Sequence, residues 1–92
     1  MATATWFQAL NLTQIKDGIW RDDATGQIVC KLGAGYMVRP HQTYWAVVEI
    51  EHGMASVRVE GGDGLNAEHQ GYLDAAFVLA NRIAIAYNER SR

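Results

Sequence analysis

The stretch TYWAVVEIEHGMASVRVE, from Thr43 to Glu60, decides the fold of this chain. In its first half Ala46, Val48 and Ile50 recur at every second position, which is the period of a β-strand. Gly53 separates the halves, where a tight turn needs a flexible residue. The stretch predicts two antiparallel strands that bury one face and expose the other. In the second half, the residues expected to point inward are Ala55, Val57 and Val59. Those expected to point outward are Ser56, Arg58 and Glu60.

The residues that follow predict a long helix packed across one face of this sheet. Asn66 is suited to cap its N-terminus, and the helix is expected to run to about Asn88. Because alanines are interleaved with larger side chains, the helix can approach the sheet closely. Placed at about 100° per residue, the apolar residues form one broad stripe that comprises Tyr72, Leu73, Ala76, Phe77, Ala80, Ile83, Ala84 and Tyr87.

The residues before this stretch predict one further hairpin and a short N-terminal helix. The segments DGIWR and QIVCKL flank DDATG, in which Gly26 suits a turn, and so predict a β-hairpin. The spacing of apolar residues in ATWFQALNLTQI indicates a short helix. The segment GAGYMVRPH contains Gly33, Gly35 and Pro40, which favour an edge strand or an irregular crossing.

Together these segments predict one α+β domain over residues 1–92. It has an antiparallel sheet of about four strands and a long C-terminal helix on one face. A length of 92 residues is enough for a single modest core.

The composition is typical of a globular protein and excludes several kinds of function. The formal net charge is −2, and acidic and basic residues are interleaved, so direct nucleic-acid binding is not expected. Cys30 is the only cysteine, which excludes an internal disulfide and a four-cysteine zinc site. The N-terminus does not resemble a signal peptide, and no apolar run is long enough for a membrane span. A cytoplasmic protein without a membrane partner is therefore expected.

The segment VEGGDGLNAEHQG, Val59 to Gly71, matches the G-x-G-x-x-G/A fingerprint of dinucleotide-binding loops. That function requires a parallel strand after the helix, and none is predicted here. The preceding strand is half polar, unlike the buried central strand of a nucleotide-binding sheet. We interpret the segment as a strand-to-helix connection, in which Asp63 is a candidate partner contact. A small-ligand-binding protein or an enzyme that uses this loop is the less favoured alternative.

No pattern of catalytic or metal-binding residues is present. The three histidines, His41, His52 and His69, have no histidine or cysteine at metal-ligand spacing. Ser56 lies on a strand without a strained turn, and Cys30 lies on the apolar face of a strand. The sequence therefore predicts a protein that is not an enzyme and has no cofactor or metal.

Aromatic and arginine side chains near the sheet form the candidate partner-binding set, since these types dominate binding hot spots. A helix covers only one face of a sheet, so one interpretation places Trp20 and Trp45 on the other face, where a partner or the N-terminal segment covers them. The favoured interpretation is that all three tryptophans are core. Glu49 and Glu51 share the face of Trp45, which disfavours RNA. The set comprises Trp20, Tyr36, Arg39, Trp45, Glu49, Glu51, Arg58 and Asp63.

Val78 and Ile85 fall seven residues apart on the polar back of the predicted helix. Two apolar residues stacked in this way are candidates for a homodimer contact. The alternative is that both pack under the N-terminal segment.

In its length, mild acidity and run of strands followed by one helix, WAVVEIEHGMASVRVEGGDGLNAEHQGYLDAAFVLANRIAIAY, the chain resembles small phage and mobile-element proteins of the anti-CRISPR type. This resemblance implies an inhibitor that occupies a surface of a host defence complex. The expected function is therefore protein binding without catalysis. The alternative is a small homodimeric accessory or regulatory protein.

Overall fold

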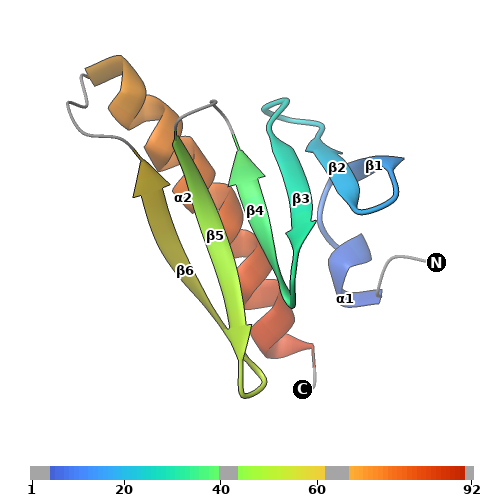
Figure 1. Cartoon of the computed structure of the whole chain (residues 1–92). Coiled ribbons are helices and arrows are strands. Elements are labelled where there is room, and N and C mark those ends of the chain that lie inside the picture. Colours follow the sequence, from blue (N-terminus) through green and yellow to red (C-terminus); the bar gives the residue numbers. More distant parts are fainter. Residues whose placement is uncertain (1–4, 40–43, 62–66, 91–92) are drawn as a thin grey trace.

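The computed structural model describes residues 5–39, 44–61 and 67–90 (Figure 1). It contains a six-stranded antiparallel sheet whose strand order follows the chain, with a long helix across one face. The α+β prediction is confirmed, but the prediction of about four strands is wrong, because there are six. The elements are α1 (Thr5–Gln8), β1 (Leu12–Lys16), β2 (Ile19–Asp22), β3 (Ile28–Leu32), β4 (Gly35–Arg39), β5 (Tyr44–Glu51), β6 (Met54–Gly61) and α2 (Ala67–Glu89).

The two additional strands are β1 and β4. The segment predicted as an N-terminal helix is helical only over α1. Its second part forms the strand β1, which pairs with β2. The β-branched residues Thr13 and Ile15 favour this extended conformation. β4 is a central strand and not an edge, since Tyr36 is aligned with Lys31 on one side and Val48 on the other. The proline that suggested an edge follows β4 in the sequence and does not interrupt it.

The turns of both predicted hairpins have the expected backbone conformations. His52 and Gly53, between β5 and β6, have φ values of 53° and 78°, as the central residues of a type I′ turn require. Between β2 and β3, Gly26 has φ 77° and its amide donates to the Asp22 carbonyl at 2.8 Å. The buried Asp22 carboxylate also accepts hydrogen bonds from the amide and hydroxyl of Thr25. The Asp22 side chain therefore fixes this turn from within.

The main core lies between α2 and the inner face of the sheet (Figure 1). The predicted burial of the apolar stripe of α2 is confirmed for its alanines and for Ile83. It is wrong for Phe77, whose side chain is 44% exposed on the flank of the helix. Leu79, absent from the predicted stripe, is buried instead. The side chains of Tyr72 and Leu73 lie outside the described residues. Sheet residues of this core include Val29, Val38, Ala46, Val48 and Ala55.

Asn88, in the last turn of α2, clamps the helix to the sheet. Its Oδ1 accepts a hydrogen bond from the Ala55 amide at 2.7 Å. Its Nδ2 donates to the Ala55 carbonyl oxygen at 3.0 Å. The amide side chain thus pairs with the outer edge of β6 as a neighbouring strand would. Across the part of the chain that the structure describes, no helix has the length and apolar content to cross a membrane.

Candidate protein-binding face

The side of the sheet opposite α2 is not covered by either described helix, and we call it the open face (Figure 1). Strand alternation decides which residues it carries, because side chains on one strand point to opposite faces in turn. Val29, Val38 and Val48 are core residues under α2, so their strand neighbours point to the open face. The central residues of the open face are Ile28, Cys30, Leu32, Met37, Arg39, Trp45, Val47, Glu49 and Arg58.

Apolar side chains form a row across the middle of the open face. Cys30, Met37 and Val47 lie directly beside one another on β3, β4 and β5. Ile19 on β2 extends the row on one side, and Arg58 on β6 ends it on the other. Ile19, Cys30 and Met37 are partly exposed, whereas Val47 is only 5% exposed. An exposed sheet face normally carries polar residues, so the partly exposed members of this row are apolar surface that no described helix covers.

A shallow hollow of about 230 Å³ lies on the open face over this row. Trp45 and Arg39 occupy one side of it, and the Arg39 guanidinium lies 5.8 Å from the centre of the Trp45 ring system. The distance is that of a cation–π contact, which orients the indole. The full lining is Leu32, Met37, Arg39, Trp45, Val47 and Arg58.

Arg58 is the second guanidinium at this hollow. Its Nε donates to Glu49 Oε1 at 2.7 Å, and both side chains are roughly half exposed. An ion pair this exposed contributes little to stability. It does fix the position of Arg58 beside the hollow. The arrangement can therefore accommodate an apolar side chain between the walls and a carboxylate against the two arginines.

Four residues of the predicted partner-binding set come together on the open face: Arg39, Trp45, Glu49 and Arg58. Glu51, at the end of β5, shares their face and is exposed. Asp63 lies outside the described residues. Met37, Leu32 and Val47 were missed, although the alternation of β3 to β5 signals them once β4 is known to be a central strand.

The favoured interpretation, that the tryptophans are core, is confirmed for Trp20 but not for Trp45, so the two do not share a face. Trp20 and Tyr36 are buried on the side of α2 and α1, where their ring centroids lie 6.0 Å apart. Phe7 stacks on Tyr36 at 5.0 Å and meets the edge of Trp20 at 4.8 Å. The cause is register, because Trp20 is aligned with Val29, a core residue. Burial, with a smaller contribution from Tyr87, raises the pKa of Tyr36 above its usual 10.0, so its phenol is neutral at physiological pH.

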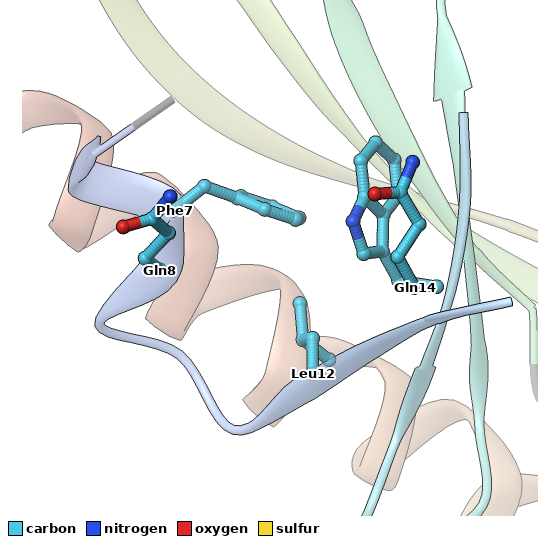
Figure 2. A pocket seen from close by; sticks show the side chains of 5 residues that line it. Phe7, Gln8, Leu12 and Gln14 are labelled. Atoms are coloured by element: carbon cyan, nitrogen blue, oxygen red, sulfur yellow. The ribbon is translucent and has the colours of Figure 1, made fainter. Parts of the chain in front are cut away.

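A second hollow, of about 200 Å³, lies between α1 and the first two strands. Figure 2 shows that Phe7 projects into it from α1 and Leu12 from β1. The indole nitrogen of Trp20, which also lines it, is buried without a hydrogen-bond partner among the described residues. The remaining lining residues, Gln8 and Gln14, are uncharged. This hollow therefore suits a neutral group better than an ion.

The candidate homodimer residues lie on the solvent side of α2. Val78 and Ile85 are both more than half exposed, at 61% and 54%. The alternative that they pack under the N-terminal segment is therefore wrong for the described residues. Their exposure leaves the prediction of a dimer contact open.

The structure describes some of the features that were considered for catalysis. In the described part of the chain, no group of three or more histidine, cysteine or acidic side chains is placed to hold a metal. Cys30 is a half-buried free thiol in the apolar row. The glycine loop itself lies largely outside the described residues. The strand before it, β6, is paired antiparallel to β5, which differs from the parallel β-α-β unit of dinucleotide-binding proteins.

Comparisons of this chain with protein-family models, with curated proteins and with solved structures found no match.

Proposed function

We propose that the protein is a non-enzymatic binding module that docks a partner protein on the open face. The observation that carries this proposal is the hollow beside Trp45, where apolar walls adjoin the guanidinium groups of Arg39 and Arg58. Buried apolar area with aromatic and arginine anchors is the usual composition of a binding hot spot.

The charges around the hollow specify the partner surface. Arg39 and Arg58 are at the hollow, and Arg21 is exposed nearby on the same face. Of the acidic residues on this face, Glu49 is already bonded to Arg58, Glu51 lies at the end of β5, and Glu60 is aligned with Trp45. The complementary partner is therefore a protein segment with an aliphatic or aromatic side chain flanked by carboxylates.

The role that we propose for this binding is inhibition of a bacterial defence complex, as the resemblance to anti-CRISPR-type proteins suggests. Occupation of a surface by a small rigid sheet requires no catalysis, which fits the predicted absence of an active site. The matching assay is phage infection of a CRISPR-immune strain that expresses the protein. Unchanged immunity in that strain would contradict this role while leaving the binding proposal intact.

Trp45→Ala tests the docking face. A partner is captured from bacterial lysate on the wild-type protein, identified, purified and titrated against each variant. Loss of the indole is expected to weaken binding by at least about tenfold, as for a hot-spot residue. Arg39→Glu is expected to weaken binding further, because it repels the carboxylates of the partner.

Val78→Ser is the matched control, since Val78 is exposed on the opposite side of the molecule. It should bind the partner as the wild type does. Circular dichroism checks that each variant is folded. If Trp45→Ala and Arg39→Glu both bind with wild-type affinity, the open face is not the docking surface.

A further inference from the structure

β6 is an eight-residue strand at the edge of the sheet, and among the described residues β5 is the one strand that pairs with it. An uncovered edge of this length presents backbone amide and carbonyl groups to which another strand can bind. The opposite edge, β1, is shorter and has an irregular register between Gln14 and Lys16, which makes it a poorer template. The outer edge of β6 is therefore the stronger candidate for strand addition.

The Asn88 clamp shows which backbone groups of β6 point outward. Both the amide and the carbonyl of Ala55 bond to Asn88 and so face away from β5. Because the orientation alternates along an antiparallel strand, Val57, Val59 and Gly61 face outward as well. Asn88 occupies the groups of Ala55, so strand addition is confined to the segment from Val57 to Gly61.

This restriction selects one register for a second copy of the chain. Antiparallel pairing about Val59 places Val59 opposite its counterpart and Val57 opposite Gly61, and it uses all three of these outward positions. The same register places Arg58 of each copy opposite Glu60 of the other, and opposite charges at such positions attract. In the neighbouring register, Val57 of one copy lies opposite Val59 of the other. This register places the two Arg58 side chains opposite one another, and it requires the amide and carbonyl of Ala55, which already bond to Asn88.

From this self-complementarity we propose that two copies pair antiparallel through β6, about Val59, to form one continuous sheet. The twofold axis is perpendicular to the sheet, so both α2 helices lie on the same side of it. Phe77 is eleven residues from Asn88 and, at about 100° per residue, lies within about 20° of it around the helix. It is 44% exposed on this flank, beside the proposed interface. Contact between the two helices through Phe77 gives an apolar layer beneath the joined strands.

The test exchanges the charges of the proposed pair. In Arg58→Glu, the new glutamate of each copy lies opposite Glu60 of the other. In Glu60→Arg, the new arginine of each copy lies opposite Arg58 of the other. Each variant alone is expected to be monomeric, or to dissociate at least about tenfold more readily than the wild type. An equimolar mixture of the two restores opposite charges at both positions and is expected to form a heterodimer. Sedimentation velocity and native mass spectrometry, which distinguishes the heterodimer by mass, provide the readouts.

Two further variants separate this interface from others. Val59→Pro removes an outward amide, which β5 does not use, and is expected to give a folded monomer. The pair Val78→Asp and Ile85→Asp on the back of α2 is expected to leave the dimer intact. The proposal is overturned if the variant with both Val78→Asp and Ile85→Asp is monomeric while Val59→Pro is still dimeric. That result would assign the dimer contact to the solvent side of α2.

The proposal is also overturned if the wild type sediments as a monomer at about 100 µM, well above the Kd of a stable dimer. It is likewise overturned if the mixture of Arg58→Glu and Glu60→Arg gains no heterodimer over the separate variants. These measurements are made without any partner protein, so their outcome is independent of the docking proposal.

Discussion

At Gly35 the backbones of β4 and β5 approach so closely that a side chain has no room. A Cβ atom at this position would collide with the carbonyl oxygen of Val48. Because the obstacle is backbone, it cannot move without disturbing the alignment of Tyr36 with Val48. Gly35→Ala is therefore expected to lower the free energy of unfolding by about 3 kcal/mol, as measured by urea denaturation.

Gly71 provides the matched control for this substitution. It lies on the exposed side of α2, where an added Cβ meets no atom. Alanine favours the helix over glycine, so Gly71→Ala is expected to raise the free energy of unfolding by about 0.5–1 kcal/mol. Equal effects of the two substitutions would contradict the close approach at Gly35.

The buried phenol of Tyr36 makes stability depend on pH in the alkaline range. Its pKa is raised in the folded state by burial and by Tyr87, so the folded protein holds this proton more tightly than the unfolded chain does. The stabilisation is complete below the usual pKa of 10.0 and is lost as pH rises through the folded-state pKa. The free energy of unfolding is therefore expected to fall more steeply above pH 10.0 in the wild type than in Tyr36→Phe. Parallel curves for the two proteins would contradict this assignment.

At the scale of elements, the Asn88 clamp joins α2 to β6. Asn88→Ala removes both hydrogen bonds to Ala55 and is expected to lower the free energy of unfolding by about 1–2 kcal/mol. It is also expected to speed exchange of the Ala55 amide hydrogen, as measured by NMR. Asn81→Ala, on the same helix, should leave that amide protected. Unchanged exchange in Asn88→Ala would show that the clamp does not form in solution.

The predictability of each element depended on the length of its pattern. β5 and β6 alternate over eight residues each and were predicted from that alternation. The position of α2 was predicted from a long apolar stripe at helical spacing. β1 has five residues, and its apolar positions fit a helix as well as a strand. β4 was misjudged because Pro40 was taken to interrupt a strand that ends at Arg39. Short elements depend on partners that are distant in sequence, and sequence periodicity does not report those partners.

At the scale of the whole molecule, the candidate site was predictable only in part. The sequence alternation grouped Trp45 with Glu49, and the structure adds Met37 and Leu32 from β4 and β3. Trp20 was included in the candidate set because alternation within a strand does not say which face a helix covers. Only the alignment of β2 with β3 decides that question, and it places Trp20 beside the core residue Val29, where its ring contacts Phe7 and Tyr36.

Because the strand order follows the chain, the sheet can assemble during synthesis on the ribosome before α2 exists. Each strand pairs with one made just before it, so little loop entropy opposes early assembly. The apolar inner face, including Val29, Val38 and Val48, then has no cover until α2 has been translated. At about 5–20 residues per second, synthesis of this helix takes a few seconds. During this interval the inner face of the nascent sheet is apolar surface to which chaperones can bind.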